Sequence, residues 1–244
     1  MTLLSLTSLA SLTEMAGAVL LATDYVGVSF WLVSAALLAA TAFFFLERSN
    51  VTNKWKTSLT LSGLVTGIAF WHYLYMREVW VTTGQSATVY RYIDWFLTVP
   101  ILMAEFYFIL RAAGSVQVSM FYKLFIGSIL MLLFGFLGET ALMPVVPAFA
   151  LAMLFWIYMI YELRMGEGAK SKNTITNVNV KSAYDTMMWI VVIGWAVYPV
   201  GYYLGYLGGG ANSNTLNLVY NLADFLNKIV FGVIIWNAAI NDSK

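Results

Sequence analysis

Lys228 lies near the middle of an apolar run, Thr215 to Ile240, that is long enough to cross a membrane. A lysine at the middle of a bilayer costs about 2.5–3.5 kcal/mol on insertion scales. Asp224, four residues earlier, shares a helical face with it. The pair is therefore either a structural contact between helices or a sign that the amine is a reactive group. In a dry pocket, such a lysine can form a Schiff base.

A second apolar run carries two acids. Asp94 and Glu105 are eleven residues apart, which returns a helix to within about 20° of its starting face and separates them by about 16 Å along the axis. Thr98 lies between them on the same stripe, and Arg91 precedes Asp94 by three residues. Acids and arginines at a helix mouth are often interfacial caps. Two carboxyl groups on one buried face could instead relay protons.

Aromatic residues accompany these polar positions. Trp95 follows Asp94, and Trp195, Tyr198 and Pro199 lie within about one turn of a later run. Aromatic side chains in a helical bundle usually belong to the core or to the membrane interface. Beside a buried lysine, they could instead enclose a flat conjugated ligand.

His72 and Pro100 raise two further expectations. His72, at a depth similar to that of Asp94, is either a core histidine bonded to a hydroxyl or carbonyl group, or a hydrogen-bond partner of Asp94. Pro100 lies between Asp94 and Glu105, where the missing N–H would kink the helix and loosen its hydrogen bonds.

The composition is that of an integral membrane protein. Of 244 residues, 61% are hydrophobic and 10% are charged, whereas soluble domains carry about 25% charged residues. The net charge of +1 gives no indication of nucleic-acid binding. The absence of cysteine excludes disulfides and thiolate metal sites, and a single histidine excludes a multi-histidine metal site. We therefore expect no metal.

Seven segments are long and apolar enough to span a bilayer, and the connections between them are short. An all-α membrane protein with a seven-transmembrane-helix bundle follows, whereas barrel strands would be only about ten residues long. The predicted spans are Tyr25–Leu46, Thr57–Met76, Arg91–Leu110, Phe121–Leu137, Pro144–Leu163, Ala183–Leu207 and Thr215–Ile240.

The loops predict how the bundle is oriented. Lysine and arginine concentrate in the connections that follow the first, third and fifth spans, and such loops are cytoplasmic in most membrane proteins. The N-terminus is therefore expected outside and the C-terminus inside. The basic residues of these loops are Arg48, Lys54, Lys56, Arg111, Lys123, Arg164, Lys170, Lys172 and Lys181.

Two smaller segments complete the organisation. Residues 1–22 are apolar without a preceding lysine or arginine, and we expect a lead-in segment or a weak signal, followed by one helical domain over residues 23–241. Between the second and third spans, Val79 to Val89 has β-branched residues around a Gly-Gln centre. That pattern predicts a short outer hairpin.

Four blocks of the sequence resemble the microbial rhodopsins, and specifically the proteorhodopsins. They are GLVTGIAFWHYLYMR, RYIDWFLTVPILMAEFYFIL, GWAVYPVGY and NLADFLNKIVFGVIIWN, and the resemblance runs from about Asp24 to Asn237. It implies a seven-helix protein that binds all-trans retinal covalently, as a protonated Schiff base of Lys228. It also implies a light-driven outward proton pump in the plasma (inner) membrane of a bacterium, assembled as a pentamer or hexamer in the lipid bilayer.

The resemblance also implies residue roles. Leu102 occupies the spectral-tuning position and resembles the green-absorbing members. The other implied roles are Asp94 as counterion and proton acceptor, Glu105 as proton donor, Asp224 as second counterion, Arg91 on its outer side, His72 as hydrogen-bond partner of Asp94, and Trp95, Trp195, Tyr198 and Pro199 as the retinal pocket.

Two alternatives remain on the same scaffold. The first is a photosensory protein that signals through a partner, although the carboxyl group at Glu105 argues against the slow photocycle of such relatives. The second is a seven-helix transporter or receptor without a chromophore, in which Lys228 and Asp224 form only a structural pair.

Overall fold

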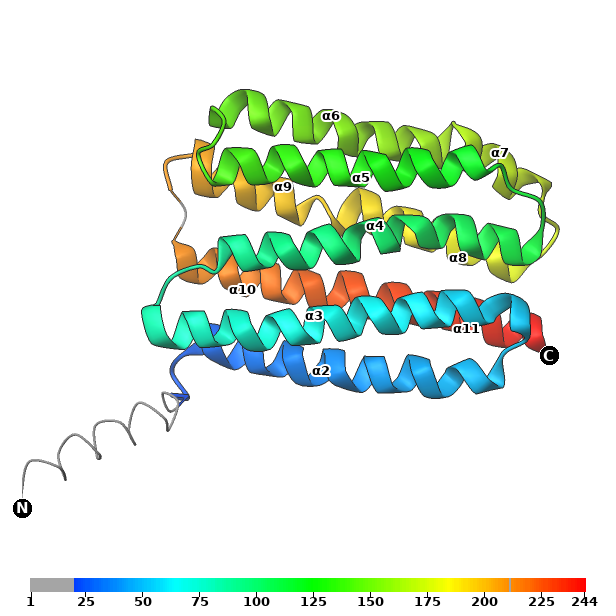
Figure 1. Cartoon of the computed structure of the whole chain (residues 1–244), viewed down its shortest axis with the longest axis horizontal. Coiled ribbons are helices and arrows are strands. Elements are labelled where there is room, and N and C mark those ends of the chain that lie inside the picture. Colours follow the sequence, from blue (N-terminus) through cyan, green and yellow to red (C-terminus); the bar gives the residue numbers. More distant parts are fainter. Residues whose placement is uncertain (1–19, 211) are drawn as a thin grey trace, which may run out of the picture.

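Long helices lie side by side in the computed structural model, which describes residues 20–210 and 212–244 (Figure 1). The expected lead-in or signal segment falls almost entirely on residues 1–19, outside the described residues. The first described helix begins after Asp24, whose carboxylate accepts a hydrogen bond from the backbone N–H of Gly27 at 2.9 Å. Because the same carboxylate also accepts from the indole of Trp80, at 3.1 Å, it ties the first helix to the second.

Seven long helical runs form the bundle, as the sequence predicts. The first five are α2 (Tyr25–Glu47), α3 (Lys56–Thr83), α4 (Thr88–Ala113), α5 (Val118–Glu139) and α6 (Val145–Arg164). The sixth run comprises α8 (Val178–Trp189), a π-helical segment (Ile190–Gly194), α9 (Val197–Tyr202) and a second π-helical segment (Tyr203–Leu207). The seventh comprises α10 (Ser213–Asp224), a π-helical segment (Phe225–Val230) and α11 (Phe231–Ser243).

Among the described residues, six of these runs are long and apolar enough to cross a membrane. The remaining run, α3, is 28 residues long but carries polar and charged residues along its length, among them Ser58, Ser62, Thr66 and His72. It packs between α2 and α4, so several of its hydroxyl groups face protein instead of lipid. The protein is therefore a multi-span membrane protein.

The connections gather at the two ends of the bundle. The links α2–α3, α4–α5 and α6–α8 lie at the end on the right of Figure 1, and the links α3–α4, α5–α6 and α9–α10 lie at the left. The lysines and arginines of the first group therefore share one end, which we call the basic end. A short helix predicted as loop, α7 (Glu167–Thr174), is also found there.

One aspartate, Asp242, links three segments of the chain at the basic end. Asp242, near the end of α11, accepts from the Trp55 indole at 2.7 Å, pairs with Lys54 at 2.6 Å and accepts from the Asn177 amide. Asn177 caps α8, since its side-chain oxygen accepts from the N–H of Val180 at 3.1 Å. The last turn of the chain thereby connects the α2–α3 link to the start of the sixth helix.

The predicted outer hairpin at Val79 to Val89 is wrong. The second helix continues through these β-branched residues to Thr83 and ends at Gly84, where φ is 64°. Helix packing overrides the local strand preference, because Trp80 is buried and bonded to Asp24. Gly84 then ends the helix in the left-handed conformation that favours glycine.

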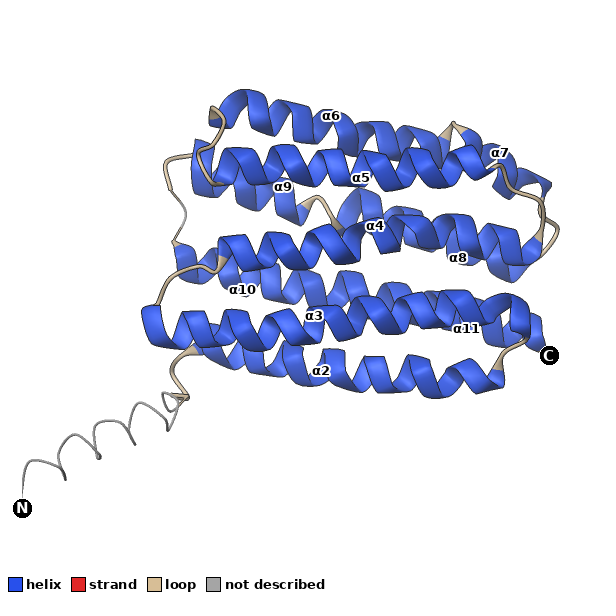
Figure 2. Cartoon of the chain, viewed as in Figure 1, coloured by secondary structure: helices blue, strands red, loops and turns tan. Residues whose placement is uncertain are grey.

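Helix irregularity is concentrated in the sixth and seventh runs. Figure 2 shows a short non-helical stretch between α8 and α9, inside the sixth run. By contrast, α4 continues as one α-helix through Pro100. The breaks therefore lie on the helices that carry the aromatic residues and Lys228.

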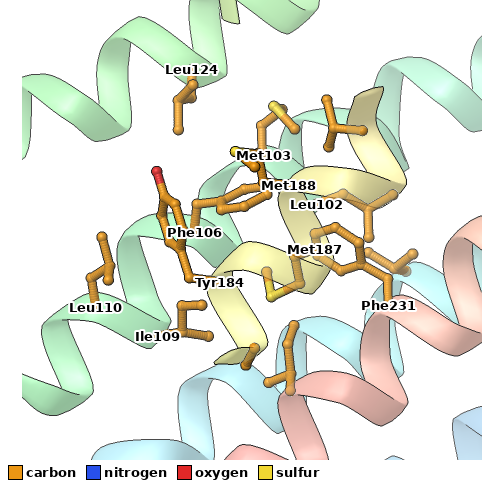
Figure 3. Packing of buried hydrophobic residues seen from close by; sticks show 14 of the residues in the cluster. Leu102, Met103, Phe106, Ile109, Leu110, Leu124, Tyr184, Met187, Met188 and Phe231 are labelled. Carbon is orange, nitrogen blue, oxygen red and sulfur yellow. The ribbon is translucent and has the colours of Figure 1, made fainter. Parts of the chain in front are cut away.

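An apolar layer fills the bundle between Lys228 and the basic end. Figure 3 shows Leu102, Phe106 and Ile109 of α4 packed with side chains of α5, α8 and α11. Phe106 and Ile109 are fully buried, and the Phe106 ring packs edge-on against Phe231 at 5.7 Å between centroids. Dense apolar packing of this kind leaves little room for water between the helices.

We expect Gly84→Val to lower the free energy of unfolding by about 1–2 kcal/mol, the strain of a left-handed conformation in an L-residue. No atom lies within 4 Å of the position a Cβ would take, so a steric clash does not contribute. Thermal unfolding in detergent measures the effect. Gly84→Asn is the matched control because asparagine tolerates this conformation; equal losses for the two variants would contradict a conformational cause.

Candidate functional site

Lys228 is buried between two carboxylates. Its side chain is 2% exposed, and those of Asp94 and Asp224 are fully buried. The Nζ atom donates to Oδ2 of Asp224 at 3.1 Å and makes a short hydrogen bond to Oδ2 of Asp94. Both carboxylates predicted near this lysine therefore contact it, one from α4 and one from its own helix.

The two carboxylates differ in how fully they are bonded. Asp224 also accepts from the hydroxyl of Tyr198 at 2.6 Å, the hydroxyl of Tyr73 at 2.9 Å and the indole of Trp95 at 3.3 Å. The Oδ1 atom of Asp94, in contrast, has no hydrogen-bond partner among the described residues. Asp94 can therefore receive a proton on a free oxygen, whereas protonating Asp224 would disrupt hydrogen bonds that stabilise its anion.

Arg91 supplies a second buried cation, 2% exposed, on the side away from the basic end. Within the described chain it has no carboxylate at ion-pair distance. Its Nη2 atom donates to the amide oxygens of Asn217 at 3.1 Å and Asn221 at 3.0 Å, and Nη1 donates to the Tyr73 hydroxyl at 3.4 Å. Since Tyr73 donates in turn to Asp224, the guanidinium is coupled to that carboxylate through one hydroxyl. The formal charges of two cations and two anions balance, as a buried site requires.

Glu105 lies apart from this cluster, fully buried and closer to the basic end of α4. The Ser62 hydroxyl of α3 donates to its Oε1 atom at 3.1 Å. The Oε2 atom of Glu105 has no hydrogen-bond partner in the described part of the chain. The hydroxyl of Ser58, one turn before Ser62 on α3, has none there either. Because no cation pairs with it there, Glu105 can exchange a proton without breaking an ion pair.

Thr98 lies on the stripe between the two acids, as predicted. It is fully buried, and its hydroxyl donates to the backbone carbonyl of Asp94 at 2.9 Å. The hydroxyl thus bonds within α4 and fixes the turn that carries Asp94.

Of the two expectations for His72, the structure shows the histidine bonded to a carbonyl group, and no hydrogen bond joins it to Asp94 among the described residues. His72 is half-buried, and its Nδ1 atom lies 2.9 Å from the carbonyl of Ile68, one turn back on α3. The next residue, Tyr73, is fully buried and donates to Asp224. One residue rotates a helix by about 100°, so the two side chains leave α3 in different directions.

An apolar cavity of about 100 Å³ reaches Lys228. That volume is several times the space one water molecule needs. All six residues predicted to bind a chromophore line it: Trp95, Leu102, Trp195, Tyr198, Pro199 and Lys228. The Trp95 and Tyr198 rings meet edge-on at 5.1 Å between centroids, so two sides of the cavity are aromatic. It fits a flat apolar molecule whose carbonyl carbon can bond to the amine.

A second cavity, of about 190 Å³, lies at the end opposite the basic end. Arg91 lines it, together with Tyr92, Glu139 and the hydroxyl-bearing residues Ser86, Thr88 and Ser213, which lie at or beside the starts of α4 and α10. The Tyr92 hydroxyl donates to Glu139 at 2.9 Å, and both residues also line the first cavity. A space lined in part by charged and hydroxyl groups therefore continues from Arg91 toward that end of the bundle.

Several residues of the site escape sequence reasoning. Tyr73 and Ser62 sit on a helix whose polar positions carry no distinctive motif, and Glu139 falls beyond the predicted fourth span. Asn217 and Asn221 could have been found, because they precede Asp224 and Lys228 at helical spacings of four, three and four residues. That pattern describes one polar face of the seventh helix.

Comparison with known proteins identifies the architecture. The family model of bacteriorhodopsin-like proteins matches residues 24–242, which includes every residue of the site. The chain belongs to the bacteriorhodopsin-like family. The resemblance to microbial rhodopsins is thereby confirmed.

Individual relatives agree with this assignment. The chain is 62% identical to a green-light absorbing proteorhodopsin of Gamma-proteobacterium EBAC31A08, over 91% of this chain and 90% of the relative. It is 61% identical to a blue-light absorbing proteorhodopsin of Gamma-proteobacterium Hot 75m4, over 91% and 89%. The solved blue light-absorbing proteorhodopsin from Med12 superimposes with a TM-score of 0.78 at 51% identity, over 89% of this chain and 99% of that one.

We expect Asn221→Leu to lower the free energy of unfolding by about 1.5–3 kcal/mol, the range for a hydrogen bond to a charged group. The substitution removes one of the three hydrogen bonds that hold the buried Arg91 guanidinium. Unfolding in mixed detergent micelles measures the loss.

Because the Asn221 amide also donates to Ser29 at 2.9 Å, Ser29→Ala is the control. It removes that second contact without touching Arg91. A loss from Ser29→Ala as large as that from Asn221→Leu would contradict the role assigned to the guanidinium.

Proposed function

We propose that this protein is a light-driven proton pump that carries retinal as a protonated Schiff base of Lys228. The observation that carries the proposal is the position of the Lys228 amine: it adjoins an aromatic cavity and contacts two carboxylates, of which only Asp94 has a free oxygen. Family membership supports it. So does a structural neighbour described as xanthorhodopsin, a light-driven ion pump with dual chromophore, with a TM-score of 0.80 at 25% identity over 92% of this chain and 96% of that one.

The residues present fit retinal. Its aldehyde can condense with the buried amine, and its flat polyene matches a narrow cavity bounded by Trp95, Trp195 and Tyr198. Bound there, retinal supplies the absorption of visible light and a bond isomerisation that moves the proton of the linkage relative to its surroundings. Leu102 lines this cavity, and we assign the protein to the green-absorbing type on that residue.

Asp94 acts as the proton acceptor. The Lys228 nitrogen donates directly to Asp94, and the free Oδ1 atom lets this carboxyl group become neutral without losing a partner. Asp224 acts as the second counterion, kept ionised by hydroxyl and indole donors and by the nearby guanidinium of Arg91. From Asp94, the proton leaves along the side of Arg91 and the cavity of about 190 Å³.

Glu105 acts as the proton donor on the other side. It is held by Ser62 and shares the stripe of Asp94 and Thr98 on α4. The apolar layer of Phe106 and its neighbours separates it from water at the basic end. Protons therefore return to the Lys228 nitrogen through one carboxyl group, while the exit side has a cavity lined by Arg91 and Glu139, and this asymmetry gives the transport its direction.

The basic end faces the cytoplasm in this proposal, following the distribution of lysine and arginine. The N-terminus is then outside, the C-terminus inside, and pumping is outward. Since the relatives named above are bacterial, we place the protein in the bacterial inner membrane. A pentamer or hexamer is the proposed assembly, with the half-buried His72 available to a neighbouring subunit.

The photosensory alternative has weaker support. A sensory rhodopsin-2 of Haloarcula vallismortis matches at 34% identity over 65% of this chain, compared with 62% over 91% for the proteorhodopsin. A carboxyl group at Glu105, positioned by Ser62, suits rapid return of the proton rather than a long-lived signalling state.

Illuminated cells that express the chain and are supplied with retinal should acidify an unbuffered medium, and a protonophore should abolish the change. Lys228→Ala should remove both the acidification and the visible absorption band, because it removes the amine that forms the linkage. A coloured Lys228→Ala protein would exclude the lysine linkage, and illumination without acidification of cells holding the coloured wild type would exclude pumping.

Glu105→Gln should slow return of the proton to the Lys228 nitrogen on the order of 10²-fold, the contribution of a positioned acid. Flash spectroscopy of the visible band measures this rate, and added azide, a small diffusible acid, should restore part of it. Ser34→Ala serves as control, since this buried hydroxyl of α2 bonds only its own helix. An unchanged rate in Glu105→Gln would remove Glu105 from the donor role.

A further inference from the structure

Two π-helical segments lie at the level of Lys228, one on the sixth helix and one on the seventh. They are Ile190–Gly194 and Phe225–Val230, and the second contains Lys228 itself. Asn227, the residue before the lysine, is 5% exposed and points from one segment to the other. Neither the proton-transfer steps nor the chromophore cavity uses this side chain.

The backbone carbonyl of Gly194 lacks its helical partner. In an α-helix it would accept from the N–H of Tyr198, but that group donates to the carbonyl of Trp195 at 3.1 Å. The partner one residue later, which a π-helix would use, is Pro199, and proline has no N–H. An uncompensated carbonyl would be costly at this depth in a membrane protein.

Asn227 supplies the missing donor. Its Nδ2 atom lies 3.2 Å from the Gly194 carbonyl and also 3.2 Å from the Tyr198 hydroxyl, so both amide hydrogens have acceptors. A Cβ at position 194 would lie 2.3 Å from Oδ1 of Asn227, so any larger residue there would displace this amide. The close approach of the two helices is therefore built around this one amide.

The second amide contact determines which way the Tyr198 hydroxyl points. A tyrosine hydroxyl has a single hydrogen, and once it accepts from Asn227, that hydrogen is free to be donated elsewhere. It is donated to Oδ1 of Asp224, at 2.6 Å. The Asn227 amide donates to the Tyr198 hydroxyl, which donates to the Asp224 carboxylate. This chain of hydrogen bonds ends on Asp224, the second counterion, and not on Asp94, the proton acceptor.

We propose that Asn227 is a positioning residue for proton transfer: it clamps the irregular segments of the sixth and seventh helices together and orients the Tyr198 hydroxyl toward Asp224. Asp224 thereby stays a poor proton acceptor, and the proton of the Lys228 nitrogen goes to Asp94. The part of this proposal that concerns proton transfer rests on the proposed function, whereas the clamp itself does not.

The clamp is tested in the dark on the retinal-bound protein. Asn227→Leu and Asn227→Ala should accelerate hydrogen exchange of the backbone amides between Ile190 and Tyr198, because the Gly194 carbonyl loses its donor. Asn237→Leu, on the same helix but exposed and bonded only to Asn241, should leave that exchange unchanged. Unchanged exchange in both Asn227 variants would overturn the clamp, whatever the protein transports.

The effect on proton transfer is tested by light-induced infrared difference spectra, in which the carboxyl bands are assigned with Asp94→Asn and Asp224→Asn. In the Asn227 variants, the ratio of protonated Asp94 to protonated Asp224 should fall by about 2- to 12-fold, the range for one neutral hydrogen bond. A wild-type protein without a light-induced Asp94 band would contradict the proposed function, while leaving the exchange experiment valid.

Tyr198→Phe shows whether Asn227 acts through the tyrosine. In that background, adding Asn227→Leu should change the ratio by less than 2-fold, because the hydroxyl it orients is already absent. An equal fall with and without the hydroxyl would overturn the positioning role, and so would an unchanged ratio in the single Asn227 variants.

Discussion

A buried amine between two carboxylates is the interaction on which the rest of the structure depends. Lys228, Asp94 and Asp224 are inside a helical bundle that itself lies in a membrane, where an uncompensated charge is costly. Two opposing carboxylates alone would leave an excess negative charge, and the buried Arg91 balances it. The tyrosine and asparagine side chains around the cluster supply hydrogen bonds to Asp224 and Arg91 in a medium without water, and Oδ1 of Asp94 is left without one among the described residues.

The same constraint explains which parts of the fold were predictable. Six of the seven spans and the concentration of basic residues at one end follow from hydropathy and charge, whereas α3 needs its packing between α2 and α4 to account for its polar side chains. The segment ending at Gly84 was mispredicted, because β-branched residues indicate a strand only where no helix packing overrides them. The π-helical segments were not predicted, since a π-helical turn is defined by backbone hydrogen bonds to the fifth residue and the sequence carries no distinct residue pattern for them.

In the site, too, relations within one helix were predictable and contacts between helices were not. Helical spacing was sufficient to place Asp94 and Glu105 on one stripe and Asp224 beside Lys228, because those relations lie within single helices. Contacts between helices depend on rotation about each helix axis, which a sequence does not specify to within one residue. His72 and Tyr73 show the consequence: they are adjacent and both can form hydrogen bonds, but Tyr73 bonds to Asp224 and His72 bonds to a carbonyl group of its own helix.

The direction of proton transfer from Lys228 depends on a difference between the two aspartates, Asp94 and Asp224. Both aspartates contact the same nitrogen, so distance alone does not select an acceptor. Asp224 accepts from three further side chains and Asp94 leaves one oxygen free, so the number of donors decides where a proton can settle. Those donors reach Asp224 from the second, third and sixth helices. Any motion that shifts one of these helices therefore changes the balance between the two carboxylates, which makes helix packing part of the proton-transfer chemistry.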